Sequence, residues 1–205
     1  MTRLRDIVGS RVAPLLKSAG FKKAGYSWNR NRGDFVDVIN LQVGKGSEKA
    51  REYFTLNAGV CVREWVGMIW KKSPAKVVHE TECTVRGRIS EIEAGLRQDA
   101  RDKWWTIESD ADAVAVGDDL MSAISDSVLP FLKRISSISD VHSLLSNLSG
   151  WQTSYPPNQI FLAIAKAKLG DREGADEILR SVIEAHPDTW AENALRVQNL
   201  VAGSK

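Results

Sequence analysis

Hydrophobic residues in the first twenty positions recur at the spacing of one helix face. Most of them are three or four residues apart, which is the pattern of an amphipathic helix. The members of this face are Leu4, Ile7, Val8, Val12, Leu15, Leu16 and Ala19. Gly20 follows them and is a typical helix stop. The pattern therefore predicts an N-terminal helix that ends near Gly20.

After this helix the hydrophobic period shortens to two. Three segments alternate in this way: 25–31 (GYSWNRN), 34–44 (DFVDVINLQVG) and 52–63 (EYFTLNAGVCVR). Polar connections separate them, which is typical of an antiparallel meander. The first connection, Arg32–Asp34, contains the Gly and Asp that a hairpin turn favours. We expect three consecutive antiparallel strands.

Shorter segments follow the meander. Glu64–Lys76 fits either a short helix or an edge segment, and both interpretations stay open. A further strand is expected at about Glu80–Ile92, and a short last strand at Lys103–Ile107. In the last of these, the adjacent Trp104 and Trp105 should point to opposite faces, because strand side chains alternate.

A helical period returns from Asp110 onward. Ser109 or Asp110 is a suitable N-cap for this helix, and Pro130 should bend or split it. A capped short helix is then expected within the segment 136–151.

The C-terminal part is predicted to be helical, after a boundary signal at Ser154–Gln159 (SYPPNQ). Two helical segments resemble a single tetratricopeptide unit in their small residues, the turn between them and the proline after them. These positions are Ala163, Gly170-Asp171, Ala175 and Pro187. Because stable arrays usually need about three repeats, we expect a helical hairpin packed on the main domain.

These elements predict an α+β fold. The N-terminal helix and the helix from Asp110 should cover one face of an antiparallel β-sheet of four to five strands, and a C-terminal α-helical hairpin should follow. The predicted organisation is an α+β domain at residues 1–150 and a helical, tetratricopeptide-like appendage at 151–205.

Composition and charge narrow the class of protein. The formal net charge of the 205 residues is only +2, whereas a dedicated nucleic-acid binder usually has a larger and more clustered positive excess. The N-terminus lacks the continuous apolar stretch of a secretory signal, and no apolar run is long enough to span a bilayer. We therefore expect a cytoplasmic protein with no membrane association.

Few residues suggest catalysis or a cofactor. Two cysteines, Cys61 and Cys83, form neither a disulfide framework nor a zinc pattern. His79 lies four strand positions from Cys83, about 13 Å away, which is too far for a base to activate a thiol. Glycine-rich phosphate loops and metal-ligand spacings are also missing. We expect no catalytic residue, no metal and no cofactor.

Several short motifs occur in an order that resembles a known family. They are LLKSAGFKKAGYSWNR, VINLQ, FTLNAGV, CTVRGRI and WW, which span Leu15–Trp105. This ordered set is similar to a group of uncharacterised bacterial proteins, the domain of unknown function 4304, and the looser similarity extends to about residue 135. The resemblance implies an α+β domain in bacteria, often encoded as a small stand-alone protein. It assigns no catalytic residue.

Amide and hydroxyl side chains share a face on two neighbouring predicted strands, beside an aromatic and a basic residue of the strand before them. They are the candidate ligand-binding residues Asn40, Gln42, Thr55 and Asn57, flanked by Trp28 and Arg30. Such a patch suits directed hydrogen bonds to a peptide, a sugar or a base edge. A solvated sheet face with cross-strand polar pairs is the alternative interpretation.

Arg86 and Arg88 are two further candidates, because residues two apart on a strand project from one face. Paired guanidinium groups can bind a carboxylate or a phosphate. Ion pairs with nearby carboxylates are the alternative, and the candidates for them are Glu80, Glu82, Glu91 and Glu93.

The favoured function is a non-enzymatic module that recognises a protein or peptide partner through the sheet face. By analogy, an immunity- or antitoxin-like role fits a small stand-alone protein. A hydrolase-like enzyme acting on a polar ligand is the alternative, and it predicts a concave pocket that collects Asn40, Asn57 and Arg86. Single-stranded nucleic-acid binding is third, and the oligomeric state stays open.

Overall fold

A computed structural model describes residues 2–48, 50–71, 75–96 and 101–203. Within them, six strands form one antiparallel sheet with the order β1-β2-β3-β4-β5, and β6 also pairs with β4. The strands are β1 (Lys22–Ala24), β2 (Ser27–Arg32), β3 (Phe35–Val43), β4 (Glu52–Val62), β5 (Val85–Arg88) and β6 (Trp105–Ile107). The predicted α+β fold is confirmed, and the meander, the hairpin turn and the short last strand are all present.

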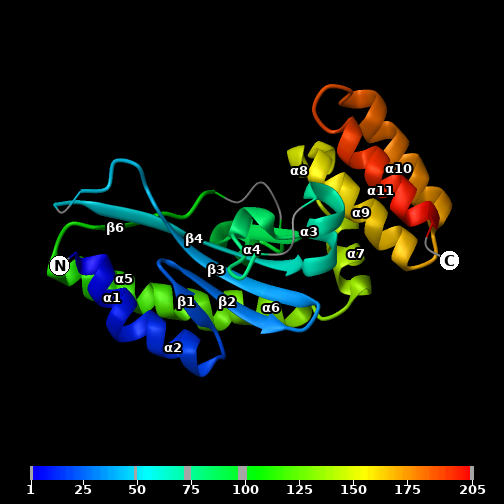
Figure 1. Cartoon of the computed structure of the whole chain (residues 1–205). Coiled ribbons are helices and arrows are strands. Elements are labelled where there is room, and N and C mark those ends of the chain that lie inside the picture. The colour runs from blue at the N-terminus through cyan, green and yellow to red at the C-terminus, as the bar shows by residue number, and fades with distance from the viewer. Residues whose placement is uncertain (1, 49, 72–74, 97–100, 204–205) are drawn as a thin grey trace.

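Two pairs of helical segments cover one face of the sheet. The chain is helical from α1 (Arg3–Ile7) through a π-helical turn to α2 (Ala13–Ser18), and again from α5 (Asp110–Ser122) through a second π-helical turn to α6 (Leu129–Arg134). Figure 1 shows these four helices lying together on the same side of the sheet. The helix pair that the sequence predicted for this face is therefore confirmed.

Pro130 does not split the predicted long helix. It is the second residue of α6 and follows directly after the π-helical turn Ala123–Val128. Helical backbone continues through this turn, with Leu129 at φ −62° and ψ −42°. Pro14 has the same position after the turn Val8–Val12. The wider hydrogen-bond register of a π turn accommodates a residue that lacks an N–H.

The core lies between these helices and the apolar face of the sheet. Alternate residues of β4, including Leu56, Ala58 and Val60, have no exposed surface. Leu16 of α2 and Ile124 of the π-helical turn between α5 and α6 are equally buried in the same cluster. Burial of these apolar side chains stabilises the packing of the helices on the sheet.

The remaining helices are α3 (Arg63–Trp70), α4 (Ile89–Glu93), α7 (Ile138–Ser146), α8 (Trp151–Ser154), α9 (Pro156–Lys168), α10 (Arg172–Ala185) and α11 (Ala191–Gly203). Of these, α4 packs against β4, β5 and the π-helical turn before α6, and the others lie at or beyond one end of the sheet (Figure 1). The open question about the segment after β4 is answered by α3, although positions 72–74 lie outside the described residues. Figure 1 places α8–α11 at the end of the sheet where β4 ends.

The single strand expected at Glu80–Ile92 is wrong in its length. Only Val85–Arg88 is extended and paired, between a 3-10 turn at Glu80–Glu82 and α4. Side-chain caps explain the difference, because the Glu91 carboxylate accepts from Arg88 N at 2.7 Å and begins a helix there.

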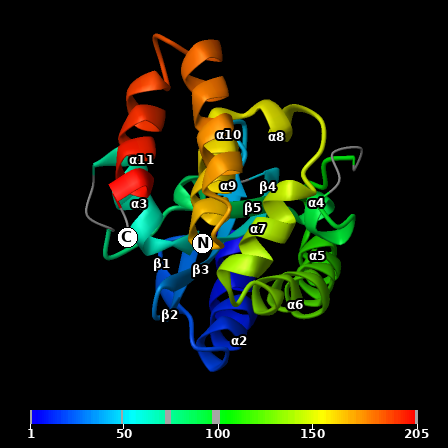
Figure 2. The same cartoon turned by 90° about the vertical axis from the view of Figure 1, so that its right-hand side faces the viewer.

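The C-terminal helices dock on α3 through aromatic contacts. The Phe161 ring of α9 lies 6.2 Å from Trp65 and 5.8 Å from Trp70, between ring centroids. Asn193 of α11 donates to the carbonyl of Ile69 at 2.8 Å. In Figure 2, α9 and α11 stand beside α3. This packing fixes where the chain between α7 and α9 lies relative to the sheet.

Candidate functional site

The second face of the sheet carries a row of polar side chains. The register pairs Asn40 with Asn57 and Asn57 with Arg88, so these residues of β3, β4 and β5 share one face. Gln42 and Arg86 lie on the same face, two positions along their strands. The structure therefore brings five of the candidate residues together, and they form the floor of a cavity.

The three amides are hydrogen-bonded to one another in a defined direction. Asn57 Nδ2 donates to Gln42 Oε1 at 3.1 Å and, more weakly, to Asn40 Oδ1 at 3.5 Å. Asn40 Nδ2 donates onward to Ser27 Oγ at 2.8 Å. Only 3% of Asn57 is exposed. The Nδ2 group of Asn57 is thus directed along the sheet, which leaves Oδ1 as the remaining acceptor of this lining residue.

The two arginines on the floor each have an acidic partner. Arg86 Nη1 lies 2.5 Å from Glu80 Oε1, and Arg88 pairs with Asp102. The first pair matches an ion pair weighed from the sequence, whereas Asp102 was not considered. The Arg88 guanidinium also lies 5.7 Å from the centroid of the Trp104 ring, an arrangement that favours a cation.

Side chains from α4 and from the segment 145–158 enclose the floor. Gln152 of α8 donates from Nε2 to Glu91 Oε1 at 3.2 Å, which connects this segment to α4. Asn158 of α9 donates to the carbonyl of Gln152 at 3.0 Å. Leu145 and Tyr155 add apolar surface to the same lining. We call the segment 145–158 the roof of the cavity.

The volume of the cavity is about 470 Å³. This lies within the range of roughly 300–1,000 Å³ that is typical of ligand pockets. The sheet face is therefore hollowed between the floor and the roof, and the hollow is partly open to solvent. Directed polar groups next to an apolar wall are what a binding pocket needs for specificity.

Three candidate residues lie outside the cavity lining. Thr55 has no exposed surface and donates its hydroxyl to the Lys103 carbonyl at 2.8 Å. Trp28 and Arg30 do not flank the amides, because Trp28 pairs with Ile39 and Arg30 pairs with Asp37 on the opposite face. Trp28 is a buried core residue there.

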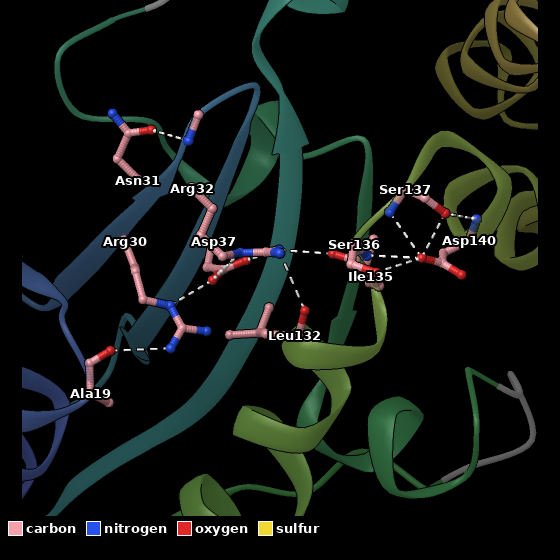
Figure 3. Close-up of polar contacts among 11 residues, drawn as sticks. Ala19, Arg30, Asn31, Arg32, Asp37, Leu132, Ile135, Ser136, Ser137 and Asp140 are labelled. Atoms are coloured by element: carbon pink, nitrogen blue, oxygen red, sulfur yellow. Dashed lines mark hydrogen bonds and ion pairs between the residues drawn. The ribbon is translucent and has the colours of Figure 1, made fainter.

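Arg30 belongs to a buried ion cluster instead. Its Nε lies 2.7 Å from Asp37 Oδ2, and Arg32 Nη2 lies 2.6 Å from Asp37 Oδ1. The guanidinium groups also donate to the carbonyls of Ala19 at 3.1 Å and Ile135 at 2.8 Å, at the C-terminal ends of α2 and α6 (Figure 3). This cluster joins both helices to the sheet and is a structural feature.

The cysteines are poor candidates for a nucleophile. Burial raises the pKa of the Cys61 thiol to about 12, and burial also raises the pKa of Cys83 well above its usual value. Both side chains are thus protonated thiols at neutral pH, whereas the thiolate is the reactive form. Together with Val36, Val38, Val66 and Val78 they form a small second core on this face.

The roof residues were not identified from the sequence. The stretch Ser154–Gln159 suggested a boundary, yet Tyr155 and Asn158 within it line the cavity. The two prolines between them were the signal for a helix start, because proline is favoured at the first positions of a helix. Asn158, the third residue of α9, lies directly after these prolines and lines the cavity.

The fold and the cavity together define an α+β protein with a polar cavity on its sheet. The family model for the domain of unknown function DUF4304 matches residues 12–134, more than half of the chain, so the chain belongs to this family. No curated protein and no solved structure matches the chain significantly. The floor of the cavity lies inside the matched range, whereas the roof lies beyond its end.

In the part of the chain that the structure describes, no helix is both long and apolar enough to cross a membrane. Among the same residues, no group of three or more His, Cys, Asp or Glu side chains is arranged to hold a metal ion.

Proposed function

We propose that this protein is a non-catalytic binding module that takes a short peptide segment of a protein partner into the cavity between the floor and the roof. The observation that carries the proposal is the alignment of Asn40, Asn57 and Arg88 across three strands, under a roof that contains apolar side chains. Amides on this face offer donors and acceptors to a peptide backbone, and Leu145 and Tyr155 offer apolar contact to its side chains.

The dimensions of the floor fit a peptide segment of a few residues. From β3 to β5 is two strand spacings, about 10 Å, and an extended peptide advances about 3.3 Å per residue. About three residues of a bound segment would therefore reach from Asn40 to Arg88. An immunity- or antitoxin-like role in a cell's cytoplasm is one setting for such a module, and it stays a prediction of the sequence.

A selection experiment tests the proposal. Short random peptides displayed on phage are selected on the immobilised full-length protein and counter-selected on an Asn40→Ala/Asn57→Ala variant. We expect peptides that bind the wild-type protein and lose at least about tenfold in affinity on the double variant, because two hydrogen-bonding groups of the floor are removed. Fluorescence polarisation measures the affinities.

The control is Asn199→Ala, which removes an exposed amide from α11, away from the cavity. Peptides from the selection should bind this variant as they bind the wild-type protein. Circular dichroism verifies that the double variant is folded. Selected peptides that bind the double variant as tightly as the wild-type protein would contradict the proposal, and so would a selection that enriches no peptide.

A further inference from the structure

The charged side chains of the cavity lining balance one another. Arg86 and Arg88 contribute two positive charges, and Glu80 and Glu91 contribute two negative charges. Each arginine is already paired with a carboxylate. Both Glu91 oxygens also accept hydrogen bonds, from Arg88 N and from Gln152 Nε2. The formal charges of these four lining groups sum to zero, so the lining has no net charge that would attract a strongly anionic or cationic ligand.

The helix that begins in the roof also offers little to an anion. Its first two residues are Pro156 and Pro157, which have no N–H group. The N–H of Asn158 donates to the Tyr155 carbonyl at 2.9 Å. The usual attraction of an anion to a helix N-terminus depends on free N–H groups, and the start of α9 lacks them at these positions.

The amides of the floor present one acceptor next to one donor. Asn57 uses its Nδ2 group on Asn40 and Gln42, and within the described part of the chain no group donates to Asn57 Oδ1. Gln42 accepts through Oε1 from Asn57, which leaves its Nε2 group as a donor. Asn57 is almost completely buried but borders the cavity, so a ligand that reaches Asn57 Oδ1 is favoured when it supplies an N–H.

We infer that the cavity selects the uncharged side-chain amide of an Asn or Gln residue in its ligand. This inference rests on the proposed binding function and names the chemistry of the bound segment. The ligand N–H donates to Asn57 Oδ1, and the ligand carbonyl accepts from Gln42 Nε2. A carboxylate of the same shape has no N–H for Asn57 and places its negative charge against that oxygen.

Isosteric capped amino acids test the inference on the full-length protein. N-acetyl-glutamine methylamide and N-acetyl-glutamate methylamide are titrated separately at millimolar concentration, and the side-chain amide signals of Asn57 and Gln42 are followed by ¹⁵N NMR. We expect saturable shifts of both signals with the glutamine compound. The glutamate compound should bind at least about tenfold more weakly, because it has no N–H for Asn57 Oδ1 and brings a negative charge against that oxygen.

Two variants locate the effect. Asn57→Ala should abolish the saturable shift of the Gln42 signal, and Gln42→Ala should weaken binding of the glutamine compound by several-fold. Gln42 is exposed, so the second variant keeps the test valid if Asn57→Ala does not fold. Asn199→Ala is the control and should bind as the wild-type protein does.

The outcomes separate this inference from the proposed function. Equal or tighter binding of the glutamate compound at the same signals would overturn the amide selectivity and leave the cavity as the binding site. The absence of any saturable shift with the glutamine compound would also overturn it. The proposed peptide-binding function fails separately, if the phage selection enriches no peptide that depends on Asn40 and Asn57.

Discussion

Gly59 lies on β4, where it pairs with Arg86 of β5 and leaves little space for a side chain. A Cβ atom at this position would lie 2.6 Å from the Val85 carbonyl oxygen and 2.8 Å from Cys83 Cβ. The oxygen belongs to the backbone of a paired strand, so it cannot move without disturbing β5. We expect Gly59→Ala to lower the free energy of unfolding by about 1–3 kcal/mol, measured by urea denaturation.

Gly9→Ala is the matched control for this substitution. Gly9 lies in an exposed helical turn, and a Cβ there would meet nothing within 4 Å. The alanine should be neutral or stabilising by up to about 1 kcal/mol, because alanine favours helices over glycine. Equal effects of the two substitutions would contradict the close approach at Gly59.

Asp37 is a fully buried carboxylate between two arginines. Asp37→Asn keeps the shape but leaves the Arg30 and Arg32 guanidinium groups facing each other without a counter-charge. Each of these side chains is about a quarter exposed, so we expect a loss at the lower end for broken buried pairs, about 3 kcal/mol. Denaturation in urea at neutral pH measures the loss.

The comparison for Asp37 is an ion pair on the surface. Asp118 lies 2.5 Å from Arg11, but two thirds of its side chain is exposed. Asp118→Asn should cost less than about 1 kcal/mol. A cost for Asp37→Asn that is no larger than this would show that the buried cluster does not hold α2 and α6 to the sheet.

At the scale of elements, hairpin geometry explains which parts of the floor could be predicted. Arg32 pairs with Phe35 across the two-residue turn Gly33-Asp34, so each even-numbered residue of β2 lies opposite an odd-numbered residue of β3. Trp28 therefore faces away from Asn40, although both numbers are even. The alternation within a strand reports which of its own residues share a face, but the turn decides which face of the next strand they join, so the prediction that Trp28 and Arg30 flank the amides was wrong.

The alternation of polar and apolar residues predicted which faces of β3 and β4 pair. The length of the loop between the two strands did not predict it. Every second residue of β4 is apolar, from Phe54 to Val62, so Asn57 must lie on the other face of the strand. The polar pattern on β3 then aligns Asn40 and Gln42 with it. Register is well specified where one face is buried, because a slip of one residue would expose that face.

Helix α7 depends on a charged cap at its start. The pKa of Asp140 is lowered by the hydrogen bond from Ser136 N and by that from the Ser137 hydroxyl (Figure 3). A lowered pKa in the folded state means that the carboxylate stabilises the fold above its unfolded pKa of 3.8. This contribution is lost as the pH falls below that value and through the folded pKa.

We therefore expect Asp140→Asn to lower stability at pH 7 and to reduce the difference from wild type as the pH falls below about 4. Urea denaturation at several pH values between neutral and acidic measures this dependence. Ser143→Ala, a change on the same helix that involves no ionisable group, should leave the difference independent of pH. A constant difference for Asp140→Asn would contradict the charged cap.

At the scale of the whole molecule, the cavity exists only because two distant segments meet. Its floor was accessible to sequence reasoning, since alternation within strands reports which side chains share a face. Its roof was not, because the position of Gln152 and Asn158 depends on the docking of α9 against α3. No local pattern in 145–158 specifies that contact, which depends on aromatic residues elsewhere in the chain.

The docking of α9 gives a test of this dependence. Phe161 is buried against Trp65 and Trp70, and Phe161→Ala should cost about 3–5 kcal/mol. Leu169→Ala, at a half-exposed position just after the same helix, should change stability by no more than about 0.5 kcal/mol. Urea denaturation is followed by tryptophan fluorescence and by far-ultraviolet circular dichroism.

If the C-terminal helices and the sheet unfold together, both signals should give one coincident transition that Phe161→Ala shifts to lower urea. Two transitions, of which Phe161→Ala shifts only one, would show that the roof is held by a unit that folds separately. In that case peptide binding should be lost in urea before the sheet unfolds, because the cavity would lose its roof while the amides of the floor stayed in place.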